Sequence, residues 1–346
     1  MCCCSCILLR SFSALLGVKY APCLDTLFLP GFIKGQRNVE NQTADFSIIK
    51  CGIDGVDSVA FSPVDNLLVC GAGLITSVWD YFTGTELYRL HGTYRIYFVT
   101  LSPDSKNIAT GLWDGEICVR DFTKGKSTII GHERREIVGI SISPTSTNTL
   151  AFISGDKTLR IRNIENKATT HVYRSDGLKP NMLMFSPGGE GLLYGDGKRL
   201  RGVVSGDLIR TVQGGTGIII TISPDGHTVI SHATDSGVTL WNAKTGTILH
   251  AASTEVYVRA AAFCPPKGEI PALAFGGGTI EIRPSSSWNL VGTLVINDMP
   301  RHITFCHDGM LLAARGNGSP VHLYDMSVEM ETFCRYQDSD LSLIHI

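Results

Sequence analysis

From about residue 45 onward, the chain is a succession of short runs in which apolar and polar residues alternate. The second group of runs is typical: residues 97–101, 107–111, 116–121 and 127–130 are rich in β-branched and other apolar residues. Alternation of this kind indicates half-buried strands, and no window shows the helical period of about 3.6 residues. Pro-Asp, Asp-Gly and Lys-Gly pairs separate the runs, and such pairs favour tight turns. The pattern predicts an all-β chain built from four-stranded antiparallel meanders.

The first run of each group ends in a recurring phrase: an apolar residue, a small residue and usually proline. The phrase occurs seven times, and its middle residue returns after 40, 41, 43, 37, 41 and 42 residues. The copies are Phe61-Ser62-Pro63, Leu101-Ser102-Pro103, Ile142-Ser143-Pro144, Phe185-Ser186-Pro187, Ile222-Ser223-Pro224, Phe263-Cys264-Pro265 and Phe305-Cys306-His307. A period near 40 residues, with one supersecondary unit per repeat, is typical of propellers and solenoids. We therefore expect repeats that bury their apolar faces against one another.

The third run of most repeats ends in a second phrase, in which an apolar residue precedes an aromatic or basic residue and usually Asp or Asn. The copies are Val78-Trp79-Asp80, Val119-Arg120-Asp121, Ile161-Arg162-Asn163, Leu240-Trp241-Asn242, Ile282-Arg283-Pro284 and Leu323-Tyr324-Asp325. Together with Thr83-Gly84, Thr245-Gly246 and Gly131-His132, they resemble the WD-repeat (WD-40-type) β-propeller family over about residues 45–326. The resemblance implies a seven-bladed β-propeller of four-stranded antiparallel blades, with strands lettered a to d from the axis outward. It also implies a non-catalytic scaffold for protein–protein interactions, a subunit or adaptor of a larger complex, without a cofactor.

The pattern divides the chain into a poorly structured N-terminal extension at 1–43, the propeller at 44–326 and a C-terminal tail at 327–346. The last six residues of the tail resemble the translation of a sequencing-library adapter, and on that interpretation the natural C-terminus is unknown and the natural chain could continue past residue 340. Closure of the ring needs one more outer strand, and two segments are candidates. We favour 46–52, because its spacing to the first a strand matches that of the equivalent segment in the next repeat. The rival is 330–336, directly after the last c strand.

Composition narrows the classes of function. The net charge is −2, so no global field attracts nucleic acid or an anionic membrane. Eleven cysteines are present, four of them within the first six residues, and they do not form the framework of a small disulfide-rich domain. We expect a reducing compartment, the cytoplasm, with the nucleus as an alternative. S-acylation of the N-terminal cysteines is a further alternative, and no apolar run is long enough for a transmembrane segment.

The sequence contains no nucleotide-binding loop, zinc-protease helix or serine-hydrolase elbow. The nearest approach to a metal-ligand group is His302 with Cys306 and His307. Cys306-His307 stands where other repeats have Ser-Pro, so we interpret it as turn variation. We expect no catalytic residue, no metal and no cofactor. The alternative is a propeller enzyme, which would need carboxylates or histidines that converge on one face.

WD-repeat blades often contain a hydrogen-bonded network of loop histidine, turn aspartate, strand-b hydroxyl and strand-c tryptophan, and the resemblance implies parts of it here. The matching residues are His132, Asp114, Asp156, Ser231, Asp235, Trp241 and Trp79. His132 and Asp156 match in the third repeat and Asp114 in the second, but Arg120 and Arg162 stand in place of tryptophan. Because no repeat has the full set, we expect a divergent and only moderately stable propeller. These residues are expected to belong to the scaffold and not to an active site.

Loops that join strand d to a, and strand b to c, share one face of such a propeller, by convention the top. Aromatic and basic residues of these loops on blades two, three and four are Tyr94, Arg95, Tyr97, Trp113, Arg134, Arg135, Lys157, Lys179, Lys198 and Arg199. Tyr, Trp and Arg are enriched in binding hot spots, and arginine matches carboxylate and phosphate groups. We predict that these residues bind other proteins or peptides, in particular acidic or phosphorylated ones. One alternative is a basic sector that binds phosphoinositide or nucleic acid. Added salt would weaken such binding steeply. The other is that these are ordinary exposed charges, with Tyr97 in the core.

Overall fold

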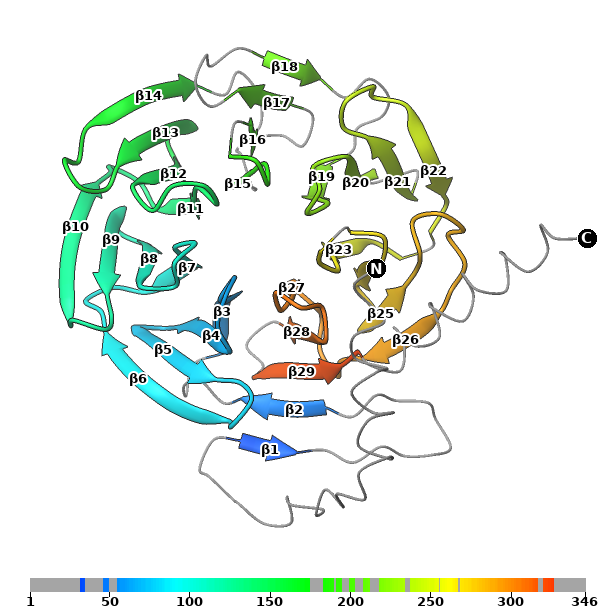
Figure 1. Ribbon diagram of the computed structural model, residues 1–346, viewed down its shortest axis with the longest axis horizontal. Coiled ribbons are helices and arrows are strands. Elements are labelled where there is room, and N and C mark those ends of the chain that lie inside the picture. Colours follow the sequence, from blue (N-terminus) through cyan, green and yellow to red (C-terminus); the bar gives the residue numbers. More distant parts are fainter. Residues whose placement is uncertain are drawn as a thin grey trace, which may run out of the picture. The chain divides into compact units, whose positions relative to one another are not determined.

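The computed structural model contains seven separate antiparallel sheets, and the first strand of each faces a common centre (Figure 1). It describes residues 32–34, 46–49, 55–174, 183–189, 191–194, 199–202, 208–211, 218–233, 237–254, 256–266, 268–316 and 320–326. All of them belong to the unit Gly31–Ile346, which is distinct from the unit Met1–Pro30. Six sheets have four strands in chain order and the seventh has five. The all-β, seven-bladed propeller predicted from the sequence is therefore confirmed.

The strands of each blade follow one another from the centre outward. Blades one and two are β3 (Val56–Phe61), β4 (Leu67–Ala72), β5 (Ile75–Asp80), β6 (Thr85–His91) and β7 (Ile96–Leu101), β8 (Asn107–Leu112), β9 (Glu116–Asp121), β10 (Lys126–His132). Blades three and four are β11 (Ile137–Ile142), β12 (Thr149–Ser154), β13 (Thr158–Asn163), β14 (Thr169–Arg174) and β15 (Leu183–Phe185), β16 (Gly191–Tyr194), β17 (Arg199–Gly202), β18 (Leu208–Thr211). Blades five and six are β19 (Ile218–Ile222), β20 (Thr228–Ala233), β21 (Gly237–Asn242), β22 (Ile248–Ala252) and β23 (Val258–Phe263), β24 (Pro271–Phe275), β25 (Thr279–Ile282), β26 (Gly292–Val295). Blade seven is β27 (His302–Phe305), β28 (Leu311–Arg315), β29 (Val321–Asp325), β2 (Phe46–Ile49) and β1 (Phe32–Lys34).

The inner strands are buried and the outer strands are exposed. In β4 and β8 every residue after the first is buried, whereas β6 has no buried residue. The sequences explain the difference, because β4 and β8 consist mainly of apolar and small residues on both faces. Strand β6 carries Glu86, Arg89 and His91 toward the rim. Each second strand is thus covered by neighbouring blades on both sides, and the core lies between the blades.

Glycine in the second strand lets the next blade approach closely. A Cβ atom added at Gly111 would lie 2.5 Å from Cγ2 of Ile137, the first residue of the next inner strand. At the equivalent Gly71 it would lie 2.8 Å from Cγ2 of Ile96. Separations below 3.0 Å are not tolerated by real Cβ atoms, so the spacing between these blades depends on glycine.

In blades two, five and seven, the small residue of the recurring phrase stabilises the turn that follows the inner strand. The hydroxyl of Ser102 accepts a hydrogen bond from the backbone N–H of Asn107 at 3.0 Å. Ser223 accepts one from Thr228 at 2.8 Å, and the sulfur of Cys306 accepts one from Leu311 at 3.0 Å. The divergent seventh phrase, with cysteine in place of serine, therefore retains the same local contact.

The ring is closed by a strand from the N-terminal side. Strand β2 pairs with β29 in antiparallel register, with Ile49 opposite Val321, and the Ile49 side chain is fully buried. The N-terminal clasp is therefore confirmed, while the rival segment 330–336 lies outside the described residues. Strand β1 then pairs with β2 as a fifth strand, although the sequence analysis assigned its residues to a poorly structured extension. Three residues in a region without repeats give too weak an alternating pattern to predict a strand.

Candidate functional site

Blade two presents an aromatic pair at its top surface. Trp113 lies in the turn between β8 and β9, is 56% exposed, and meets the Tyr97 ring edge to face with centroids 5.3 Å apart. Its backbone N–H donates to the carbonyl of Arg95 at 2.9 Å, which ties this turn to the loop before β7. Tyr94 of the same loop is 49% exposed, and Tyr97 is half-buried. The side chain of Tyr97 thus supports an exposed indole and is not a residue of the deep core.

The guanidinium of Arg95 is used within the scaffold. Its Nε and Nη2 atoms donate to the two carboxylate oxygens of Asp57 in blade one, at 3.0 and 2.8 Å. The same guanidinium lies 6.0 Å from the centroid of the Tyr97 ring. Bidentate pairing fixes the side chain and neutralises its charge. Arg95, which the sequence predicts to be a cation available to a partner, is paired with Asp57 and joins blades one and two.

The turn that carries Trp113 lies directly against the loop that carries Arg134 and Arg135. Gly115, with a φ angle of 94°, accepts a hydrogen bond at its carbonyl from the backbone N–H of Glu133 at 2.8 Å. A Cβ atom at Gly115 would be 2.6 Å from the carbonyl oxygen of Arg135, so the two backbones are in contact. Arg134 and Arg135 are both exposed. The structure thus brings the predicted residues of blades two and three onto one continuous surface.

The other predicted top-face residues are placed less fully. Lys157 is exposed in the turn between β12 and β13. Arg199 is the first residue of β17, opposite Tyr194 and Thr211 on the neighbouring strands. Lys179 and Lys198 lie outside the described residues, so a binding role for blade four stays a prediction.

Beneath this surface, a buried carboxylate holds two arginines. Glu133 is 7% exposed, and its oxygens lie 2.9 Å from Nη1 of Arg160 and 3.2 Å from Nη2 of Arg162. Arg162 also donates to the carbonyl of Ile130 in blade two at 3.1 Å, and its guanidinium lies 5.3 Å from the centroid of the Phe152 ring. Arg162 occupies the strand-c position of the usual tryptophan. The arginine is therefore accommodated by a carboxylate from the preceding loop and by an aromatic face.

The expected network is present in fragments. His132 pairs with Asp114 of the preceding repeat at 3.2 Å, although the sequence analysis placed it with Asp156. Asp156 instead accepts a hydrogen bond from the backbone N–H of Thr158 at 2.9 Å and lies 3.4 Å from Arg160. Burial acts to raise the pKa of Asp156, but these hydrogen bonds and the charge of Arg160 outweigh it and lower the pKa. His132 is the last residue of β10 and therefore lies in blade two beside the turn of Asp114, whereas the sequence repeats group it with Asp156 of blade three.

The tryptophan positions of blades one and five are buried. Trp79 is 2% exposed and its indole N–H donates to Ser77 at 2.9 Å. Trp241 is 1% exposed and Ser231 is 8% exposed, but among the described residues the indole N–H of Trp241 has no hydrogen-bond partner. Asp235 lies outside the described residues.

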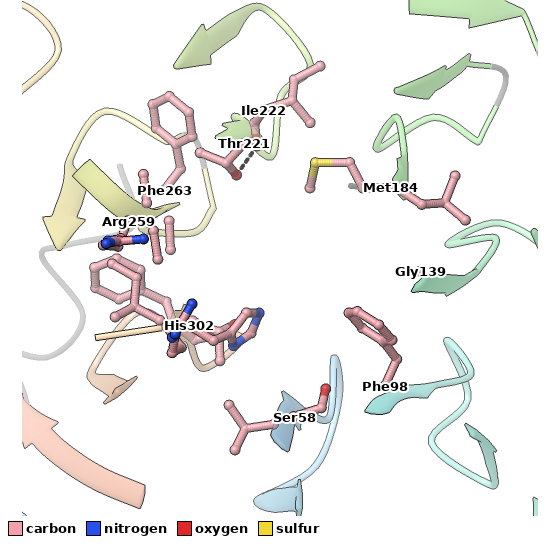
Figure 2. A pocket seen from close by; sticks show the side chains of 18 of the residues that line it. Ser58, Phe98, Gly139, Met184, Thr221, Ile222, Arg259, Phe263 and His302 are labelled. Carbon is pink, nitrogen blue, oxygen red and sulfur yellow. Dashed lines mark hydrogen bonds between the residues drawn. The ribbon is translucent and has the colours of Figure 1, made fainter. Parts of the chain in front are cut away.

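A channel of about 860 Å³ runs along the centre and is lined by the inner strands of all seven blades. Figure 2 shows Arg259 and His302 on one side of it, with Phe98 and Met184 on the other. Polar and apolar residues share the lining. Among the described lining residues, arginines occur only in blades six and seven: Arg259, Arg301 and Arg315.

We use the term channel-mouth cluster for Arg259, Arg301, His302 and Arg315. Each is at the top end of its strand: Arg259 and His302 near the start of inner strands, Arg301 just before β27, and Arg315 at the end of β28. Sequence reasoning missed this cluster. The signal in the sequence is their position at the start of strand a or the end of strand b, where side chains reach the top face.

The residues that the sequence placed nearest to a metal site do not converge. His302 begins β27, whereas Cys306 and His307 follow its other end. Burial and a hydrogen bond to Asp308 raise the pKa of the Cys306 thiol to about 12, so it is protonated at neutral pH and serves the turn. Among the described residues, no three His, Cys, Asp or Glu side chains are grouped as metal ligands would be. The described part of the chain also contains no helix that is both long and apolar enough to span a membrane.

Comparisons with known proteins agree with this architecture. The family model "WD domain, G-beta repeat" (WD40) matches residues 84–121. A relative, the Periodic tryptophan protein 2 homolog of Dictyostelium discoideum, is 26% identical over 167 residues, which are 46% of this chain and 18% of that protein. The match thus spans less than a fifth of the relative's length.

Among solved structures, a chain of the mitotic checkpoint complex superposes with a TM-score of 0.72 and 13% sequence identity. The superposition covers 87% of this chain and 98% of that one, and at this identity it shows the fold alone. The repeat period, the blade topology and the WD40 match confirm the resemblance found in the sequence. The chain is a seven-bladed β-propeller that matches the WD40 repeat model at residues 84–121 and is similar to WD-repeat proteins.

Proposed function

We propose that the chain is a non-catalytic scaffold that binds another protein on the top surface of blades two and three. We call this surface the top-face patch, formed by Tyr94, Tyr97, Trp113, Arg134 and Arg135. The observation that carries the proposal is the exposed indole of Trp113 beside two exposed arginines. An exposed tryptophan held in one orientation is costly to solvate, and such residues are enriched at the centres of protein interfaces.

The charge of the top-face patch favours an acidic partner. Arg134 and Arg135 are exposed, whereas the neighbouring carboxylate of Glu133 is buried against Arg160 and Arg162 and does not offset them. Arg95 is neutralised by Asp57 and adds nothing to the surface charge. Two adjacent arginines beside an aromatic ring match a carboxylate or phosphate group on an otherwise apolar peptide.

The comparisons support a binding role of this kind. WD-repeat propellers bind other proteins, and the similar solved structure belongs to a multiprotein complex. We also propose a reducing compartment, the cytoplasm. Its support is that Cys70, Cys118, Cys264 and Cys306 are buried thiols, without a disulfide among the described cysteines.

The test is affinity capture from a lysate, followed by mass spectrometry, with the wild-type chain and a W113A/R134A/R135A variant. We expect recovery of the specific partners to fall at least tenfold, because one aromatic anchor and both available cations are removed. The matched control is Phe82→Ala, which removes an aromatic side chain that is 82% exposed, in the turn between β5 and β6.

Thermal melting of both variants must match the wild type for the comparison to be valid. Equal partner recovery by the triple variant and the wild type would contradict the proposal. Equal loss in the triple variant and in Phe82→Ala would show that exposed aromatic residues bind unspecifically.

A further inference from the structure

A second hollow of the propeller lies between two blades and is separate from the central channel. This interblade groove has a volume of about 330 Å³ and is lined by residues of blades five and six, which are consecutive in the ring (Figure 1). Its lining includes Val238, Thr254, Val256, Leu273, Phe275 and Trp288. The described residues that line the groove are different from those that line the channel. The groove is therefore a distinct hollow with its own walls.

The groove lies where this chain lacks a buried tryptophan. In the repeats, the position of Arg283 is held by Trp79 in blade one and by Trp241 in blade five. Both indoles are at most 2% exposed and pack against the preceding blade. The guanidinium of Arg283 instead binds within its own blade, with Nε donating to Glu281 and Nη1 to the carbonyl of Trp288, both at 2.8 Å. The space that an indole would occupy between blades five and six is therefore left partly open.

The groove follows the length of β25. Ile280 and Ile282 of this strand belong to the core shared with blade seven. The alternate residues face blade five and line the groove: Thr279, Glu281 and Arg283. At about 3.3 Å per residue, positions 279 to 283 extend over about 13 Å. An extended segment of about four residues fits this length, whereas a compact small molecule would leave part of it empty.

The groove is apolar and carries no net charge. Leu273 and Phe275 are buried in the core between blades five and six, and Val256 is 43% exposed at the top end of the groove. Glu281 and Arg283 are the charged residues among its described lining residues, and they pair with each other. A charged occupant would lose its hydration without gaining an opposite charge, so the groove favours an uncharged, apolar occupant.

Trp288, at the other end of the groove, has a strained backbone. Its φ angle of 59° is one that bulky side chains rarely adopt. Its N–H donates to the carbonyl of Pro284 at 2.8 Å, and its ring stacks on that of His250 in β22 with centroids 5.8 Å apart. Leu290, two residues further along, is 51% exposed and extends the apolar surface. Strain of this kind is concentrated at binding and catalytic sites, and the fixed indole offers an aromatic surface to an apolar side chain.

The groove also contains a polar group without a partner. The hydroxyl of Thr254, in the loop after β22, is buried and makes no hydrogen bond to the described residues. An unpaired buried hydroxyl costs free energy, and native proteins rarely leave one. The main chain of a bound peptide would supply the missing hydrogen bond, whereas a purely apolar molecule would not.

We infer that the interblade groove is a second binding site, which takes an extended, uncharged peptide segment with an apolar side chain against Trp288 and its main chain at the hydroxyl of Thr254. The groove arises from the replacement of tryptophan by Arg283, so it is a feature of this chain and not of the repeat pattern. The inference rests on the proposed function only for the class of occupant, a protein segment. It does not depend on the top-face patch, which favours an acidic partner.

The experiment uses the full chain and two synthetic peptide libraries with degenerate, uncharged flanking positions. One library has a central leucine, methionine or phenylalanine, and the other has a central serine. Gly277 lines the groove, a Cβ atom there would meet nothing within 4 Å, and its φ angle is one that other residues adopt. Gly277→Phe therefore narrows the groove without a clash, and Gly277→Ser is the matched control that leaves it open.

Binding is measured by fluorescence anisotropy. We expect Gly277→Phe to weaken binding of the apolar library by about tenfold or more, because the bound side chain loses its burial. Gly277→Ser and W113A/R134A/R135A should bind like the wild type. Val256→Ser should weaken binding by about threefold, whereas Val172→Ser, at a valine that is 54% exposed in β14, should not. Melting midpoints are compared for all variants, and the two valine variants decide the outcome if Gly277→Phe does not fold.

Several results would overturn the inference. Equal binding of the two libraries, or binding of neither, would exclude recognition of an apolar side chain. Equal affinities of Gly277→Phe and Gly277→Ser would place the binding outside the groove, and equal losses in the two valine variants would indicate unspecific adhesion. A dimer of the wild type that Gly277→Phe converts to a monomer in light scattering would assign the groove to a second copy of the chain. Partner capture by the top-face patch is unaffected by any of these results, so the two proposals are tested separately.

Discussion

Replacing Glu133 with glutamine tests how blade three tolerates arginine where tryptophan is usual. The side chains of Glu133, Arg160 and Arg162 are 8%, 19% and 17% exposed, so the pair is nearly buried. Removing one partner from a buried ion pair costs about 3–5 kcal/mol when nothing else compensates. Here Arg160 keeps Asp156 at 3.4 Å, and Arg162 keeps the hydroxyl of Thr169 at 2.9 Å.

The amide oxygen of glutamine retains one of the two hydrogen bonds, and a charge-assisted bond is worth about 1.5–3 kcal/mol. We therefore expect E133Q to lower the free energy of unfolding by about 2 kcal/mol. For a domain of this size the melting midpoint falls by about 2 °C per kcal/mol, which gives a loss of about 4 °C.

Differential scanning calorimetry and urea denaturation would measure this loss, with Glu165→Gln as the control. Glu165 is an exposed glutamate of the same blade, so its replacement should change the midpoint by less than about 1 °C. A double-mutant cycle of E133Q with R162Q should show a coupling of about 1 kcal/mol. Equal melting of E133Q, E165Q and the wild type would refute the reasoning, as would strict additivity in the cycle.

Two further predictions concern packing and pH. Gly111→Val should destabilise the ring by about 3 kcal/mol or more, because its side chain would overlap Ile137. Gly125→Val, where the space is open, should cost only the strain of a φ angle of 66°. The melting midpoints of the two variants, compared with the wild type, check this. Burial and the charge of Arg315 lower the pKa of His302 to about 4, so the folded state binds fewer protons than the unfolded state between pH 6.5 and 4. The contribution of neutral His302 to the free energy of unfolding is fully present above pH 6.5. It is lost as the pH falls toward 4, and the loss is at most about 3 kcal/mol. His302→Asn should therefore lose less stability than the wild type between pH 7 and 5, and parallel losses would contradict the assignment.

The contacts that form within a single repeat could be predicted from the local sequence. The phrase around Ser102 predicts the end of an inner strand, because the hydroxyl must accept a bond from Asn107 five residues later. Cys306 meets the same requirement with a sulfur, which is why the repeat survives the change. Ile49 could be assigned to the clasp since its segment keeps the spacing of an outer strand.

Contacts between blades could not be predicted in the same way. Arg95 is 38 residues from Asp57, and nothing near either residue in the sequence indicates the bidentate pair. His132 pairs with Asp114 within blade two because it ends β10, whereas the sequence repeats group it with Asp156. Such contacts depend on the path of each loop after the sheet is formed, and a repeat alignment does not contain that path.

The same limit explains why the candidate surfaces emerge only in three dimensions. Glu133 was unremarkable in the sequence, yet its buried carboxylate fixes the loop whose next two residues, Arg134 and Arg135, face solvent. A loop held in place loses little conformational freedom when a partner binds, which preserves affinity. The departure from tryptophan at position 162 thus requires a buried acid next to the exposed basic pair. In blade three, the residues that compensate for an unusual core also position the proposed binding surface.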